Sequence, residues 1–129
     1  MVAMERLLWV CLGGAAGSGA RYLVTGWVSE RLSAGFPWGT LCVNVVGSFL
    51  LGAIMQLAST ASPFSPTTQV TLTIGVLGGF TTYSTFNYET LASFQQGAWL
   101  LAAANLLATV VGCLAAGFLG QAAVRVAAG

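Results

Sequence analysis

Two sets of polar and small side chains recur at helical spacing inside apolar parts of the sequence. The first set comprises Thr40, Asn44, Ser48, Gly52 and Gln56. The second set comprises Asn105, Thr109, Cys113, Gly117 and Gln121. Because residues four apart share one face of a helix, each set predicts a polar stripe. Such a stripe either hydrogen-bonds helices to one another or lines a path, and neutral amide and hydroxyl donors are what a small dehydrated anion requires.

A different pattern lies between the two stripes, in residues 75–89 (GVLGGFTTYSTFNYE). Two adjacent glycines are followed by four hydroxyl residues: Gly78, Gly79, Thr81, Thr82, Ser84 and Thr85. Glycine pairs and β-branched polar residues are poor helix formers, so the sequence predicts that a helix is interrupted here. Interrupted backbone inside a membrane has to line a site or be buried in protein, and freed carbonyls suit a cation.

Three aromatic residues, Phe80, Tyr83 and Phe86, recur at intervals of three within this segment. On a membrane helix such residues ordinarily pack against their neighbours. Their electropositive ring edges can instead hold an anion weakly, without the full positive charge that would trap it. The pattern therefore makes all three rings candidate contacts for an anion.

Two ionisable residues lie inside the apolar stretches. Glu89 is the carboxylate away from the ends of the expected helices, and Arg21 is the cation well inside an expected span. A charged residue at such depth is energetically costly and is by default a functional candidate. Arg21 can alternatively extend toward the membrane surface, where it either draws anions into a vestibule or has a structural role.

The composition around these residues is that of a membrane protein. Of 129 residues, 57% are hydrophobic and 5% are charged, and the mean hydropathy is +0.85. Four basic and three acidic residues, with no histidine, cannot form a basic surface for nucleic acid or a clustered His and carboxylate metal site. Cys11, Cys42 and Cys113 lie far apart in apolar sequence, which favours buried thiols over disulfides or zinc ligands.

Charges and turn residues divide the chain into four stretches long enough to cross a bilayer, at 4–28, 38–58, 69–94 and 98–124. The most loop-like separator is 59–68, and Trp38 and Trp99 stand where interfacial aromatics belong. The sequence thus predicts a single all-α transmembrane domain over residues 1–129, with four transmembrane helices and a break in the third. A secretory signal at the N-terminus is disfavoured, because the first stretch continues through Arg21 and Trp27.

The basic residues give almost no orientation signal. With four spans, Arg6 and Arg125 lie on one side of the membrane and Arg31, beside Glu30, lies on the other. A chain without this bias can insert in both directions, and two oppositely inserted copies can pair about an axis in the membrane plane. We therefore expect a dual-topology, antiparallel homodimer, with a single orientation set by later contacts as the alternative.

Several segments match a known family: residues 19–21 (GAR), 38–41 (WGTL), 43–44 (VN), Gly47 and 78–86 (GGFTTYSTF). With these segments the chain resembles the Fluc/CrcB family of fluoride-specific ion channels along essentially its full length. The resemblance implies a passive, fluoride-selective channel that exports fluoride and protects the cell against its toxicity. It also implies an antiparallel homodimer that crosses the bacterial inner membrane several times and holds a structural sodium ion at the dimer interface.

Matching positions give expectations for single residues. Backbone carbonyls of Gly78 and Thr81 would hold the sodium ion. Fluoride would meet the amide of Asn44 and the ring edge of Phe86. The other expected contacts are the hydroxyl track of Thr82, Ser84 and Thr85, the carboxylate of Glu89 at its end, and Asn105, Thr109 and Cys113 on the last helix. Tyr83 replaces a phenylalanine of the family, and its hydroxyl would either hold fluoride too long or turn aside.

Three other functions compete with this interpretation. A small multidrug-type proton-coupled exporter is also short and often dual-topology, but it carries an essential carboxylate in the first helix, whose interior here offers only Arg21 as an ionisable group. A membrane scaffold leaves the interrupted segment as unexplained strain. An enzyme is disfavoured, because no nucleophile and base can be paired without His, Asp or Lys.

Overall fold

The computed structural model describes residues 1–61 and 63–129, which form helices joined by short connections. Within these ranges, three helices are long and apolar enough to cross a membrane: α1 (Val2–Arg31), α2 (Trp38–Ala61) and α6 (Trp99–Ala128). The shorter helices described between α2 and α6 are α3 (Pro66–Val70), the π-helix η1 (Thr71–Leu77), α4 (Gly78–Phe80) and α5 (Tyr83–Gln95). The described ranges contain no strand, so the prediction of an all-helical protein is confirmed.

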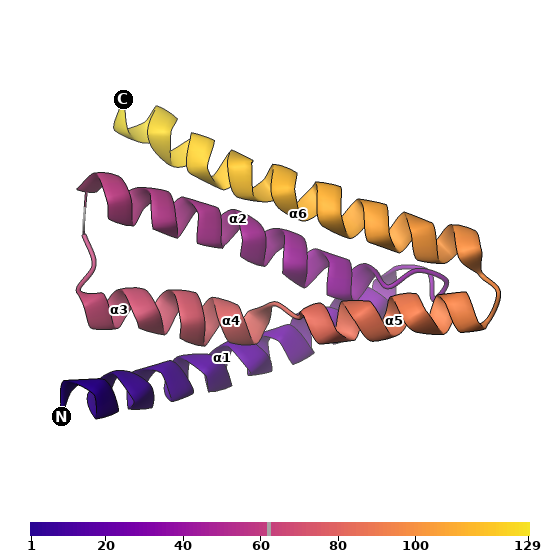
Figure 1. Cartoon of the computed structure of the whole chain (residues 1–129), viewed down its shortest axis with the longest axis horizontal. Helices are drawn as coiled ribbons and strands as arrows, with labels where there is room; N and C mark the ends of the chain where they lie inside the picture. The colour runs from indigo at the N-terminus through magenta and orange to yellow at the C-terminus, as the bar shows by residue number, and fades with distance from the viewer. Residues whose placement is uncertain (62) are drawn as a thin grey trace.

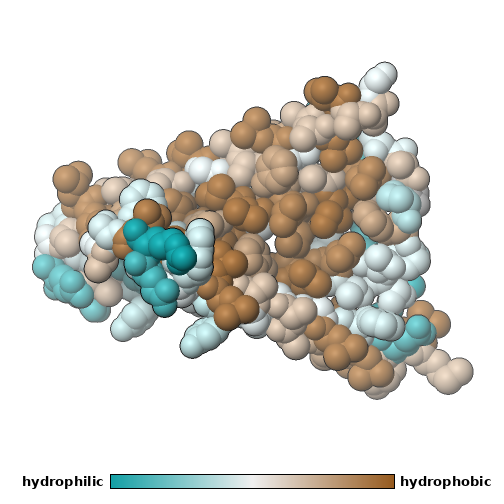
Figure 2. Space-filling model, turned by 180° about the vertical axis from the view of Figure 1, so that it is seen from behind, coloured by the Kyte–Doolittle hydropathy of each residue, from teal (hydrophilic) through white to brown (hydrophobic). Residues whose placement is uncertain are grey.

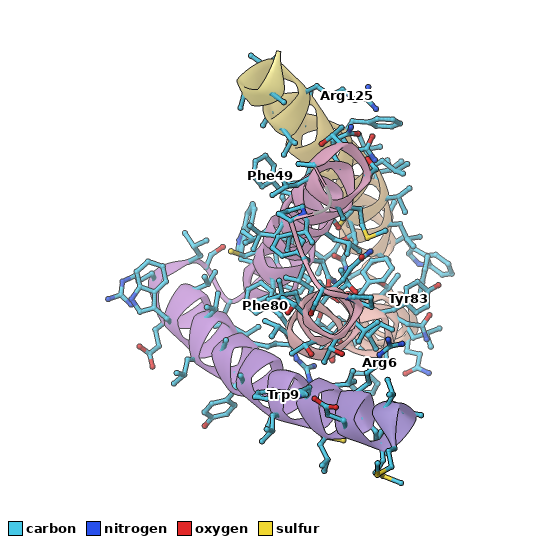
Figure 3. All side chains as sticks on the ribbon, turned by 90° about the vertical axis from the view of Figure 1, so that its left-hand side faces the viewer. Arg6, Trp9, Phe49, Phe80, Tyr83 and Arg125 are labelled. Carbon is cyan, nitrogen blue, oxygen red and sulfur yellow. The ribbon has the colours of Figure 1, made fainter. Side chains whose placement is uncertain are left out.

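The helices alternate in direction along one long axis of the molecule. Helix α1 runs forward, α2 returns, the row from α3 to α5 runs forward along a single line, and α6 returns beside α2 (Figure 1). Both ends of the chain lie at the same end of the molecule. The row of short helices is therefore placed between α1 on one side and the α2–α6 pair on the other, as the end-on view in Figure 3 also shows.

Glycines allow these helices to approach one another closely. A side chain on Gly52 of α2 would meet the backbone carbonyl of Gly117 in α6. On the other side of the molecule, a Cβ atom on Gly13 of α1 would lie 2.8 Å from the carbonyl oxygen of Thr71 in η1. Close approach through small residues is how membrane helices associate when lipid removes the hydrophobic driving force. Two glycine seams thus join α2 to α6 and α1 to η1.

The connection after α2 is shorter than predicted. Helix α2 continues to Ala61 and α3 already begins at Pro66, whereas the sequence predicts a loop over 59–68; Ser62, within that loop, lies outside the described residues. Proline suits the first turn of a helix, where its missing N–H has no helical partner to lose. The hydroxyl of Ser65 caps this start by accepting a hydrogen bond from the N–H of Thr68 at 3.1 Å.

The third predicted span is interrupted between α4, which ends at Phe80, and α5, which begins at Tyr83. The glycine and hydroxyl pattern predicts this position, but nothing in the sequence analysis predicts the π-helix that precedes it. Within η1 the hydroxyl of Thr73 donates to the Gln69 carbonyl at 2.8 Å. A π-helical stretch is rare and is found mostly beside functional sites, which directs attention to the residues that follow it.

Most large apolar side chains of the long helices face outward. Figure 2 shows apolar surface across the middle of the molecule and polar residues toward its two ends. Leu100 and Leu107 of α6, for example, are strongly exposed. In water such a surface would drive association, whereas in a bilayer it is the surface that faces lipid or a partner. The helices and their surface are those of a membrane protein.

Candidate functional site

The site is built around two residues of extended backbone that separate α4 from α5. Thr81 has φ −90° and ψ 159°, and Thr82 has φ −152° and ψ 114°. The N–H and the hydroxyl of Thr81 both donate to the carbonyl of Leu77, each at 3.0 Å, and these are the last bonds of the helical run before the interruption. Thr82 then begins the next helix as its N-cap residue.

The amide of Asn44 holds this interruption together from α2. Its Nδ2 donates to the Thr82 carbonyl at 3.0 Å, and its Oδ1 accepts from the Thr82 N–H at 2.7 Å. Asn44 is 8% exposed, so both hydrogen bonds are buried, and the one from the Thr82 N–H replaces a lost helical bond. In a continuous helix the Thr82 N–H would donate to the carbonyl of Gly78. Its diversion to Asn44 leaves that carbonyl without its helical donor.

Thr82 also organises the hydroxyl groups at the start of α5. Its Oγ1 accepts from the backbone N–H of Thr85 at 3.3 Å and donates to the hydroxyl of Thr85 at 3.0 Å. The hydroxyl of Ser84 lies 3.5 Å from the same oxygen. Since a hydroxyl has one proton, that of Thr82 is used on Thr85, and Thr85 keeps its own proton for another acceptor.

A groove of about 530 Å³ runs beside the interruption, between the row of short helices, α2 and α6. It brings together eight of the residues that the sequence analysis selects: Asn44, Gly78, Thr81, Thr82, Tyr83, Phe86, Thr109 and Cys113. Much of the remaining wall is apolar. A largely apolar groove with a few converging polar groups is the usual form of a binding site or a path.

A second hollow of about 370 Å³ lies on α1, α2 and α5 and contains Arg21, Thr82, Thr85 and Glu89. The hydroxyl of Thr40 donates to Oε1 of Glu89 at 2.7 Å. Within the described residues, Oε2 of Glu89 and Nε of Arg21 are both buried and have no hydrogen-bond partner. Thr82 lines this hollow as well as the groove, whereas its partner Asn44 lines the groove alone.

Three predicted site residues, Phe80, Ser84 and Asn105, line neither space. Figure 3 places Phe80 and Tyr83 on opposite sides of the row of short helices. Tyr83, 76% exposed, meets the ring of Phe86, 4% exposed, edge to face at a centroid distance of 5.7 Å and an angle of 66°. Two of the three predicted rings therefore lie together in the groove.

Asn105 is 2% exposed and belongs to a chain of hydrogen bonds between α5 and α6. The hydroxyl of Thr90 donates to the Phe86 carbonyl at 2.8 Å, and Nδ2 of Asn105 donates to that hydroxyl at 2.9 Å. The hydroxyl of Thr109 in turn donates to Oδ1 of Asn105 at 3.4 Å. Since a carbonyl can only accept, the Phe86 oxygen fixes the direction of every bond in this chain.

Three further residues, Thr40, Ser48 and Thr90, belong to the site although they are not among the residues predicted to contact the ion. Thr40 bonds the carboxylate of Glu89, Ser48 lines the groove, and Thr90 links Asn105 to the backbone of Phe86. Thr40 and Ser48 lie four residues before and after Asn44, so their position on the same helix face could have indicated their part in the site. For Thr90 the sequence carries no comparable signal, because its partner is fifteen residues away on another helix.

Taken together, the groove is lined by amide, hydroxyl and thiol groups and by ring edges, and contains no charged side chain among its described lining residues. Groups of this kind can replace part of the water around a small anion without binding it tightly. No cluster of His, Cys, Asp and Glu that could hold a metal occurs in the part of the chain that the structure describes.

Comparison with known proteins finds one family match and several relatives that share a single name. Residues 8–121 match the family described as CrcB-like protein, Camphor Resistance (CrcB). A protein of Anaeromyxobacter dehalogenans named fluoride-specific ion channel FluC is 56% identical over 126 residues, which cover 98% of this chain and all of the relative. A protein of the same name from Sorangium cellulosum is 52% identical over 122 residues, covering 95% of this chain and 96% of the relative.

Proposed function

Because the chain belongs to the CrcB-like family, we propose that it is a fluoride-selective, passive ion channel that exports fluoride and protects the cell against it. The main structural support for this proposal is the groove beside the interrupted helix, in which neutral donors and ring edges converge. Fluoride is small and strongly hydrated, so a selective path has to supply several donors in place of its water. The protein is a channel and not an enzyme.

The proposal is tested by efflux from liposomes that contain the purified protein. Liposomes loaded with potassium fluoride should release fluoride when valinomycin balances the charge, and liposomes loaded with chloride should not release chloride. Proton-driven uptake of an organic cation in place of fluoride efflux would favour an exporter instead. If neither fluoride efflux nor cation uptake occurs, the result would favour a membrane scaffold without transport activity.

The row from α3 to α5 supplies the remaining transmembrane span in this proposal. It lies along one line beside α2, and its two halves together are about as long as a spanning helix (Figure 1). With α1, α2 and α6 it makes a four-span protein of the bacterial inner membrane. The buried bonds of Asn44 to Thr82 support this assignment, because they satisfy a backbone N–H that would otherwise have no partner at membrane depth.

The working unit in this proposal is an antiparallel homodimer with dual topology. Its support is the near absence of an orientation signal among the basic residues and the openness of the groove, whose wall includes the exposed Tyr83 and Gly78. A second copy would cover this apolar surface. Opposite insertion would place the same groove toward both sides of the membrane.

We further propose that a structural sodium ion binds the backbone at the interruption. Gly78 and Thr81 would hold it through their carbonyls, the hard oxygen ligands that such a cation prefers. The Gly78 carbonyl has lost its helical donor to Asn44, which supports its availability. The ion would supply positive charge to an otherwise neutral surface. Replacing sodium by N-methylglucamine during purification should dissociate the dimer or abolish efflux, and an unchanged dimer with unchanged efflux would contradict this assignment.

A further inference from the structure

The groove is lined by one serine, Ser48, whose hydroxyl has no hydrogen-bond partner among the described residues and no role assigned above. Ser48 lies one helical turn after Asn44 on α2 and is half-buried. Among the described residues its hydroxyl has no hydrogen-bond partner, yet its oxygen is not sealed off from open space. A helical serine or threonine ordinarily donates to the carbonyl one turn earlier. Ser48 therefore keeps its proton for something in the groove.

The threonine hydroxyls of the same groove are already occupied. Thr73 donates to the Gln69 carbonyl at 2.8 Å and Thr81 to the Leu77 carbonyl at 3.0 Å. Thr82 donates to Thr85. Each of these hydroxyls has one proton, so it presents lone pairs to the groove while its bond persists. Lone pairs repel an anion.

Thr109 lines the groove as well, but its proton is also used elsewhere. Because the Phe86 carbonyl can only accept, Thr90 has to donate to it, Asn105 has to offer its N–H to Thr90, and the oxygen of Asn105 is left facing Thr109. The Thr109 proton is directed at that oxygen, although the 3.4 Å distance makes this the weakest bond of the chain.

We propose that Ser48 is a fluoride-contacting residue that acts together with the remaining N–H of Asn44 as two donors one turn apart on α2. This inference rests on the proposed function of the channel. Asn44 has two amide protons and uses one of them on Thr82, so one N–H is left. Two neutral donors separated by about 6 Å along a helix face bind an ion in succession and weakly, which conduction requires.

The test compares serine substitutions on the same helix. Ser48→Ala removes the donor, Ser48→Thr keeps it, and Ser59→Ala removes a hydroxyl that donates to the Gln56 carbonyl at the exposed end of α2, outside the groove. Each variant is reconstituted at equal protein density, and passive fluoride efflux is measured. Since a hydrogen bond to a charged group is lost, Ser48→Ala should slow efflux about tenfold. Ser48→Thr and Ser59→Ala should remain within about twofold of the original chain, a difference too small to reflect such a bond.

Thermal unfolding in detergent separates this role from a structural one. The Ser48 hydroxyl bonds nothing in the described chain, so Ser48→Ala should unfold at the same temperature as the original chain. Efflux by Ser48→Ala at the original rate would overturn the inference, as would an equal loss in Ser48→Thr or in Ser59→Ala. If the original chain itself releases no fluoride, the proposed channel function fails instead, and the two failures are distinguishable.

Discussion

The amide of Asn44 uses its oxygen and one of its two N–H groups on the backbone of Thr82. The residue that the family resemblance places beside the ion is thus also the residue that closes the interrupted helix. These two roles are compatible because a primary amide has two donors and two acceptor lone pairs. As a consequence, substitutions of Asn44 should lower the stability of the folded protein, whatever their effect on conduction.

Replacing Asn44 by leucine should therefore destabilise the protein. The change leaves the N–H of Thr82 buried without a partner, at a cost of about 1–3 kcal/mol, and removes a second donor from its carbonyl. The same substitution at Asn87, which is exposed on α5 and has no side-chain hydrogen bond in the described chain, should cost less than about 1 kcal/mol. Unfolding of the two variants in detergent checks this, and equal stability of the two would contradict the bonding described for Asn44.

Tyr83 gives a prediction on conduction alone. Its ring contacts Phe86 and is 76% exposed, and its hydroxyl has no partner in the described residues, so Tyr83→Phe should leave stability unchanged. We expect faster fluoride efflux from this variant, because a phenol that donates to the ion slows its release. Tyr88→Phe, a matched change of a 72% exposed tyrosine on the same helix, should leave efflux unaltered. Equal rates for all three proteins would show that the Tyr83 hydroxyl points away from the path.

Between helices, close packing at Gly13 and Gly75 holds η1 against α1. Gly13→Ala places a Cβ atom 2.8 Å from a backbone oxygen, which cannot move as a flexible side chain would. Overpacking of this kind costs about 1–3 kcal/mol, so this variant should unfold at a lower temperature. Gly19→Ala on the same helix has open space around it and should unfold no earlier than the original chain, since alanine is the better helix former. A reversed order of the two would show that α1 does not pack as described.

The long helices and the interruption follow from the sequence because they depend on local properties. Apolar length predicts α1, α2 and α6, and the pair Gly78 and Gly79 followed by threonines predicts the end of α4. The π-helix and the bond between Asn105 and Thr90 do not follow, because both depend on packing between helices. Spacing could likewise show that Asn44 lies on a polar face, but not that its amide faces Thr82.

The proposed dual topology predicts that added positive charge will fix the direction in which the protein inserts. Ser33→Lys with Ala34→Lys adds positive charge to the connection between α1 and α2, and Ala127→Lys with Ala128→Lys adds it to the C-terminus at the opposite end of the molecule. Each double variant should insert in one direction only and protect fluoride-sensitive cells poorly when expressed alone. Co-expression of the two should restore protection, because oppositely inserted copies can pair again. Full protection by either variant alone would contradict the antiparallel dimer.

The π-helix fixes the number of residues in the segment that leads to the interruption. Because its backbone bonds skip one residue more than those of an α-helix, the chain before it and the chain after it are phased as though about one residue had been inserted. Deleting a residue within 71–77 would restore regular α-helical bonding but rotate one side of the helix by about 100° about its axis relative to the other. The rotation would displace either Gly75, which packs against Val10, or Thr81, which borders the groove. Insertions and deletions that homologues of this chain tolerate should therefore fall at 32–37 or 96–98 and spare 71–82.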